Sequence, residues 1–144
     1  MNIYPGSILR SALSTRLASA TFGTALALLV LSPTFAGDAA KAVKTAARHA
    51  EFAAAADNIT GVHMHLHHAL NCLVGPDGVS FDADAMNPCE GMGNGAIPDS
   101  ANDAAKQALQ KAVRQAESGL SSQDLASAQQ AARKTGEILK AQDM

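Results

Sequence analysis

Residues 38–74 read DAAKAVKTAARHAEFAAAADNITGVHMHLHHALNCLV, and this stretch decides the fold class. It is rich in alanine, contains no proline and has one internal glycine, Gly61. Alanine has the highest intrinsic helix propensity of the amino acids, so the stretch is predicted to be helical. It forms a single helix if the chain runs unbroken through residues 57–61, and two helices if these residues form a turn.

Two further helical segments are expected after a long loop. Residues 75–99 contain five glycines, three prolines and five acids but no base, a composition typical of loops. Residues 100–118 and 121–142 again favour helix, with Ser100 and Ser121 as the expected N-caps. The chain is therefore predicted to be all-α, a small up-and-down bundle of three or four helices with a long Gly/Pro/Asp-rich loop.

Apolar stripes at helical spacing support this fold, but they are thin. Residues that recur at steps of three, four and seven face the core of a bundle. The stripes consist of Ile59, Val62, Leu66, Leu70 and Leu73; of Leu109, Ala112, Val113 and Ala116; and of Leu125, Ala128, Ala132 and Leu139. Alanine buries little apolar area, and a domain of about 100 residues is only marginally stable. A covalent link is therefore expected to contribute to stability.

The N-terminus has the pattern of a secretory signal peptide. A basic region with Arg10 is followed by the apolar run of residues 17–31 and by a small-residue cleavage motif that ends at Ala36. Cleavage there makes residues 1–36 the signal peptide and residues 37–144 the helical bundle domain. The alternative is an uncleaved membrane anchor, but about 15 apolar residues are fewer than the ~20 that a spanning helix needs. The protein is expected to be periplasmic or secreted.

The expected mature chain is mildly acidic. From residue 37 onward it has nine Lys and Arg against thirteen Asp and Glu, with no tryptophan and no tyrosine. Such a chain has neither a basic cluster that would neutralise phosphates nor aromatic platforms on which bases would stack. Nucleic acid is therefore not an expected partner.

Cys72 and Cys89 are the only cysteines of the chain. In an exported protein two cysteines are expected to form a disulfide, because the compartment is oxidising. The disulfide would tie the end of the histidine-rich stretch to the loop. It would close a loop of sixteen intervening residues, for which the chain-entropy model gives a stabilisation of about 3 kcal/mol. Ligation of a metal by the two thiolates is the main alternative.

Four of the five histidines fall between residues 63 and 68. On a helical projection, His63 and His67 lie at one border of the apolar stripe, four residues apart, where two imidazoles can converge on one ion. His49 lies on the same side if the helix is unbroken. This pair is the predicted metal site, and His68 is the next choice.

A second polar stripe lies on the opposite side of the same helix. It consists of His65, His68 and Cys72, with Met64 at its edge. His65 is expected to be solvated and to contribute little. If an ion is held away from the border pair, this stripe or the acidic loop is the expected place.

Imidazole is a common ligand of zinc, copper and nickel, and thioether sulfur adds a preference for Cu(I). The sequence thus predicts an exported protein that captures or buffers a transition metal ion, copper before zinc or nickel. No enzyme is predicted, because the sequence has no serine in a nucleophile-elbow context and Cys72 is expected to be oxidised rather than nucleophilic. Expected partners are the ion and another protein or a second copy of the chain, with no nucleic acid and no membrane after signal cleavage. The alternative is a structural or protein-interaction helical module with a surface histidine cluster.

Overall fold

The computed structural model describes residues 37–142, and within them the regular secondary structure is entirely helical. Four long helices and one short helix follow one another along the chain. They are α1 (Ala39–Ala55), α2 (Ile59–Val74), α3 (Ala96–Asp99), α4 (Asp103–Leu120) and α5 (Leu125–Lys140). The predicted all-α bundle is confirmed in its four-helix form. The predicted signal peptide, residues 1–36, lies outside the described residues.

The chain breaks between α1 and α2, close to residues 57–61, where the sequence allowed either one continuous helix or a turn. Ala56 has an extended backbone after the last turn of α1, and Asn58 caps the start of α2. The Asn58 side chain accepts a hydrogen bond from the backbone N–H of Gly61 at 2.8 Å, which satisfies a donor that the first helical turn leaves free. The alanine-rich stretch therefore forms a helical hairpin.

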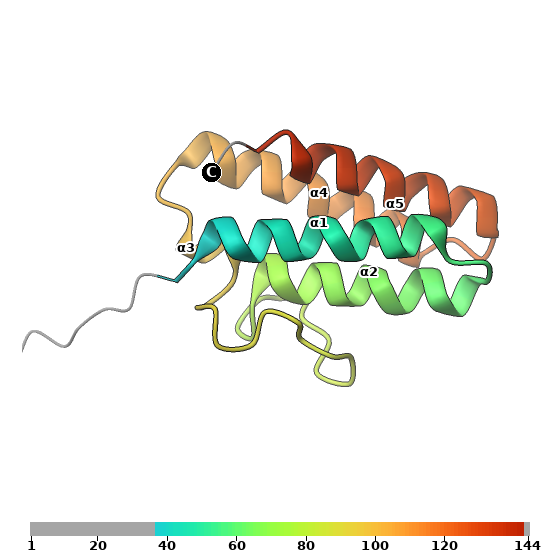
Figure 1. Ribbon diagram of the computed structural model, residues 1–144, viewed down its shortest axis with the longest axis horizontal. Helices are drawn as coiled ribbons and strands as arrows, with labels where there is room; N and C mark the ends of the chain where they lie inside the picture. The colour runs from blue at the N-terminus through green and yellow to red at the C-terminus, as the bar shows by residue number, and fades with distance from the viewer. Residues whose placement is uncertain (1–36, 143–144) are drawn as a thin grey trace, which may run out of the picture. The chain divides into compact units, whose positions relative to one another are not determined.

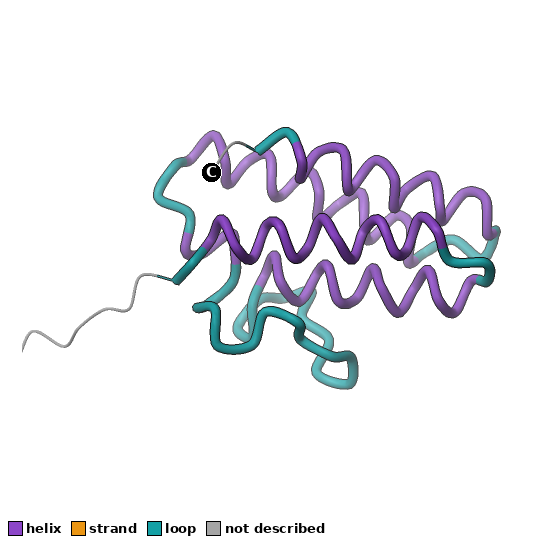
Figure 2. Tube along the Cα trace, viewed as in Figure 1, coloured by secondary structure: helices purple, strands orange, loops and turns teal. Residues whose placement is uncertain are grey.

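The four long helices run up and down, each antiparallel to the one before it (Figure 1). The main packing seams join α1 to α2 and α5, and α4 to α5 and α2. Figure 2 shows the long connection between α2 and α4, which runs as loop along α2 before it reaches α3 and α4. None of the helices among residues 37–142 is both long and apolar enough to cross a membrane.

The core is built mainly from the predicted stripes. Leu66, Leu70, Leu73, Leu109 and Leu139 are fully buried among many alanines. Close helix approach is visible at Gly119 of α4, where an added Cβ would lie only 2.6 Å from Leu66 Cδ1. Small residues therefore let the helices approach closely, and the core has few large side chains.

The predicted N-caps are wrong by two and three residues. Asn102 caps α4 by accepting from the backbone N–H groups of Ala104 and Ala105, and Asp124 caps α5 by accepting from that of Ser127. The two serines instead close the preceding helices. The Ser100 hydroxyl donates to a carbonyl of α3 at 2.7 Å, and the Ser121 hydroxyl donates to a carbonyl of α4 at 2.9 Å. A serine can serve either end of a helix, and here it does so at the C-terminal end.

The predicted disulfide between Cys72 and Cys89 is present. Both residues are buried, and Cys89 Sγ lies 3.8 Å from the carbonyl oxygen of Ala42 on α1. The disulfide therefore fixes the loop against the seam between α1 and α2.

Asn71 holds the same loop through its buried side-chain amide. Its Oδ1 accepts from the N–H of Asp82 at 2.8 Å, and its Nδ2 donates to the carbonyl of Asp82 at 2.9 Å. Nδ2 also lies 3.3 Å from the carbonyl oxygens of Ala85 and Met86. Two adjacent residues of α2, Asn71 and Cys72, thus attach the loop to the bundle.

Candidate metal centre

Three histidines meet at the seam between α1 and α2. His49 comes from the middle of α1, and His65 and His68 lie one turn apart on α2. The second polar stripe of α2 therefore faces α1, with His68 followed one turn later by the disulfide-bonded Cys72. The two packed helices therefore supply ligands from both sides of one candidate site.

The nitrogen atoms of this cluster lie at distances that suit a shared ion. One ring nitrogen from each histidine lies within 4.8 Å of the other two, and Nδ1 of His49 is 3.4 Å from Nδ1 of His65. Two nitrogens on one tetrahedral zinc ion, each about 2.05 Å from the metal, are about 3.3 Å apart. One edge of a coordination polyhedron is therefore already formed. The third nitrogen, from His68, lies within 4.8 Å of the other two.

His68 is the most buried member of the cluster. The residue is 6% exposed, and its Nδ1 has no hydrogen-bond partner among the described residues. Buried polar atoms in proteins are nearly always hydrogen-bonded, so such an atom requires an explanation, of which a bound ion is one.

The environment keeps the three imidazoles neutral. Burial, together with the neighbouring His68 and His65 rings, lowers the pKa of His49 from 6.5 to about 4. Burial also lowers the pKa of His65, and burial followed by the charges of His65 and His67 lowers the pKa of His68. Neutral imidazole is the form that binds metals, so protons compete weakly for this site.

Aromatic and basic side chains border the cluster. The Phe52 ring lies 5.6 Å from the His49 ring and 5.4 Å from the His65 ring, centroid to centroid. The guanidinium carbon of Arg48 lies 4.9 Å from the Phe52 centroid. Met64, four residues before His68 on α2, is 47% exposed. The cluster is thus bordered by the apolar ring of Phe52, and the cation Arg48 lies next to that ring.

The pair predicted as the first choice, His63 and His67, is placed differently. His63 Nε2 is 2.9 Å from the carbonyl oxygen of Ser122, in the connection between α4 and α5. His67 Nδ1 is 2.9 Å from a carboxylate oxygen of Asp82 in the loop. Each ring contacts a different segment of the protein. The predicted alignment of His49 with this pair required an unbroken helix. The helix is broken at residues 56–58, so that alignment does not hold.

The expectation that His65 is solvated on a far side is wrong. This side of α2 faces α1, and His65 is only partly exposed and contacts His49. A helical projection shows the faces of one helix but not which face a neighbouring helix covers. A signal for the observed pairing was present, because His49 and His65 each lie eight residues from Asp57. Residues equidistant from the turn lie side by side in an antiparallel hairpin.

No protein-family model matches the chain, and no curated protein or solved structure matches it. Function is therefore inferred from the geometry of the site itself.

The lowered pKa values predict that the metal-free protein loses stability in mild acid. A histidine whose pKa is lower in the folded state contributes stability above its unfolded pKa of about 6.5, and this stability is lost as the pH falls towards the folded value. The loss should appear between pH 6.5 and about 4 in urea unfolding of chelator-stripped protein. A His49→Gln variant should lose less over this window. Identical losses in both proteins would contradict the assignment.

Proposed function

We propose that this protein binds a late first-row transition metal ion through His49, His65 and His68. The observation that supports this proposal is the convergence of three imidazoles from two helices, with the buried Nδ1 of His68 lacking a partner among the described residues. Three imidazoles leave a coordination position open to water or to an exchanging ligand. Capture or buffering of the ion, without catalysis, is the function proposed.

Copper is the proposed ion, followed by zinc and nickel. The three ligands are neutral, and Arg48, whose guanidinium lies over the neighbouring Phe52 ring, is a cation. A divalent ion would keep its full charge in this partly buried site, whereas Cu(I) brings a smaller charge and so a smaller desolvation cost. Cu(I) also accepts imidazole ligands and thioether sulfur, which the exposed Met64 offers on the same helix.

An oxidising compartment outside the cytoplasm is the proposed location. The signal-peptide pattern of residues 1–36 carries this proposal. The Cys72–Cys89 disulfide supports it, because structural disulfides persist in exported proteins. Intact-mass measurement of protein from the producing cells tests it, since export with cleavage after Ala36 leaves a chain that begins at Gly37. A mass that includes residues 1–36 would contradict it.

Isothermal titration of chelator-stripped protein is the test of metal binding. Saturable binding of one ion per chain is expected, for Cu(I) under a thiol-free reductant that spares the disulfide, and for Zn(II) in air. Weak binding without a fixed stoichiometry would contradict the proposal. The histidine rings, which already contact one another at centroid distances of 5.0 to 5.5 Å, would then be a structural cluster of an interaction module.

Metal binding should also raise the melting temperature of the protein. An ion that binds only the folded state stabilises it by about 2.7 kcal/mol when its free concentration is 100 times the dissociation constant. The His49→Ala/His65→Ala variant should lose most of this rise in a thermal melt followed by circular dichroism. The His63→Ala/His67→Ala variant is the matched control, and an equal rise in wild type and in the first variant would place the ion elsewhere.

A further inference from the structure

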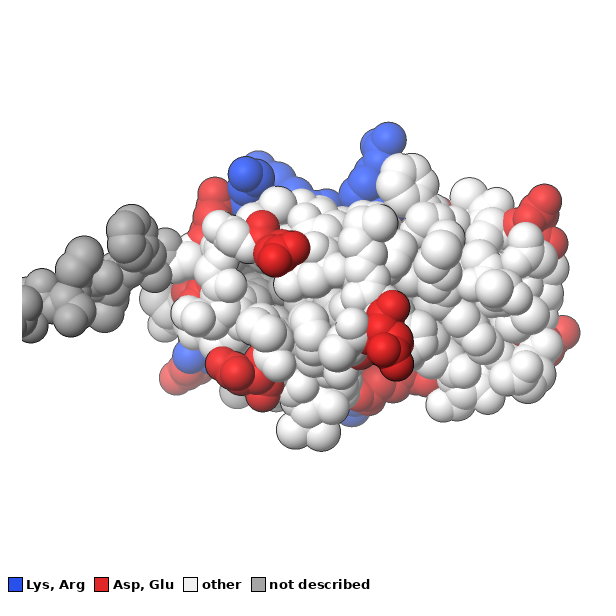
Figure 3. Space-filling view, turned by 90° about the horizontal axis from the view of Figure 1, so that it is seen from below, with Lys and Arg blue, Asp and Glu red and all other residues white. Residues whose placement is uncertain are grey.

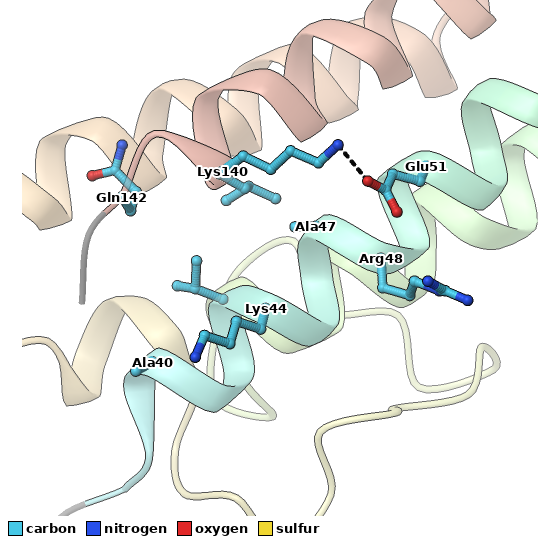
Figure 4. Close-up of a pocket in the computed structure, with 9 residues that line it drawn as sticks. Ala40, Lys44, Ala47, Arg48, Glu51, Lys140 and Gln142 are labelled. Atoms are coloured by element: carbon cyan, nitrogen blue, oxygen red, sulfur yellow. Dashed lines mark ion pairs between the residues drawn. The ribbon is translucent and has the colours of Figure 1, made fainter.

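A groove between α1 and the C-terminal end of α5 is a second candidate binding site. Its volume is about 630 Å³, within the range of about 300–1,000 Å³ that is common for small-molecule sites. The apolar side chains of Val43, Ala47 and Leu139 line it and are themselves mostly buried. Figure 4 shows the groove between the two helices, with the short side chains of Ala40 and Ala47 along α1. The groove thus has an apolar floor and space above it.

Basic side chains predominate at the rim of the groove. Lys44 and Arg48 come from α1 and Lys140 from α5, and among the described lining residues Glu51 is the one acid. Lys140 is ion-paired with Glu51 across the groove (Figure 4). The rim keeps a net positive charge, although acids outnumber bases from residue 37 onward. Figure 3 shows one face of the molecule, on which most of the visible Lys and Arg atoms lie along one edge.

Two of these cations repel each other. Lys44 and Arg48 are four residues apart on α1, a spacing at which like charges destabilise a helix. Both are exposed, and Lys44 makes no ion pair with any residue in the range 37–142. The N-terminus of α1 and the C-terminus of α5 lie at the same end of the bundle (Figure 1), so their dipoles oppose each other and the side chains set the local potential. An anion close to Lys44 would offset this repulsion.

We propose that this groove binds a small organic anion with an apolar tail. Its carboxylate or phosphate contacts Lys44, a rim cation that makes no ion pair with any described residue, and its tail lies on Val43, Ala47 and Leu139. The charge pattern selects an anion, and the floor selects a ligand with apolar surface rather than an inorganic ion. The histidine cluster contributes no residue to this groove, so the proposal stands independently of metal binding.

Titration calorimetry of the chelator-stripped protein with octanoate tests the proposal. Octanoate should bind saturably, and its affinity should fall as salt is raised, because exposed charges are screened. Octylammonium, with the same tail and the opposite charge, and acetate, with the same head and no tail, should bind at least about tenfold more weakly. Equal binding of octanoate and octylammonium would overturn the proposal. So would binding to vesicles of anionic phospholipid without binding of soluble octanoate.

Two variants locate the ligand. Lys44→Glu reverses one rim charge and should weaken octanoate binding by about tenfold, whereas Lys111→Glu makes the same change at an exposed position of α4 and should leave binding unchanged. Ala40→Phe, in the first turn of α1, should block the groove without touching a charge. Circular dichroism shows whether each variant is folded. Equal effects of Lys44→Glu and Lys111→Glu, or full binding by a folded Ala40→Phe protein, would overturn the proposal.

Discussion

Replacing His68 with alanine is expected to weaken metal binding by more than about 100-fold, because changes in residues that merely orient a ligand already cost 10- to 100-fold. His49→Ala should have a comparable effect, since it removes the one ligand that α1 supplies. Competition against a chelator of known affinity measures both losses. Because His68 is buried, its variant is first checked for a native circular dichroism spectrum, and the half-buried His49 gives the second reading.

His63→Ala is the matched control for this experiment. It removes the same side chain from the same helix, but His63 contacts Ser122 rather than the cluster. The metal affinity of the His63→Ala variant should stay close to that of the wild-type protein. The opposite result, a large loss in His63→Ala and none in His68→Ala, would show that the border pair predicted from the helical projection holds the ion.

Removing the disulfide is expected to lower the free energy of unfolding by about 3 kcal/mol. The Cys72→Ala/Cys89→Ala variant frees the loop that the disulfide holds against α1 and α2. The loss should be a large fraction of the total stability, because the core has few large side chains and small domains are stable by only about 5–15 kcal/mol. Urea unfolding followed by circular dichroism measures it.

Reduction of the wild-type protein supplies the control. A thiol reductant should lower wild-type stability to that of the double variant and should leave the variant itself unchanged. If wild type and variant unfold at the same urea concentration without reductant, the disulfide does not contribute to stability. Asn71 would then be the main attachment of the loop, through its hydrogen bonds to Asp82.

The sequence alone was enough for the features that depend on local composition and period. Alanine content and apolar spacing predicted helices over the segments that became α1, α2, α4 and α5, and the glycine- and proline-rich segment predicted the loop. The buried face of α2, with Val62, Leu66, Leu70 and Leu73, followed from its spacing. The disulfide followed because the chain has a single possible pair, Cys72 and Cys89.

The tertiary structure decided the features that depend on which segments become neighbours. Nothing in the local pattern around Asn71 indicated that its amide would hold the loop. Such contacts join residues far apart in sequence, and they form only once the helices have packed.

The candidate metal centre depended on both levels. The sequence placed His65 and His68 on one stripe of α2 and supplied His49 in the preceding segment. The turn at residues 56–58 reversed the chain and set α1 against that stripe, which brought the three rings together. A helical period determines which residues share a face, whereas the packing of one helix on another determines which face becomes a site. Local periodicity therefore identified the histidines as candidates, and only the hairpin selected three of them.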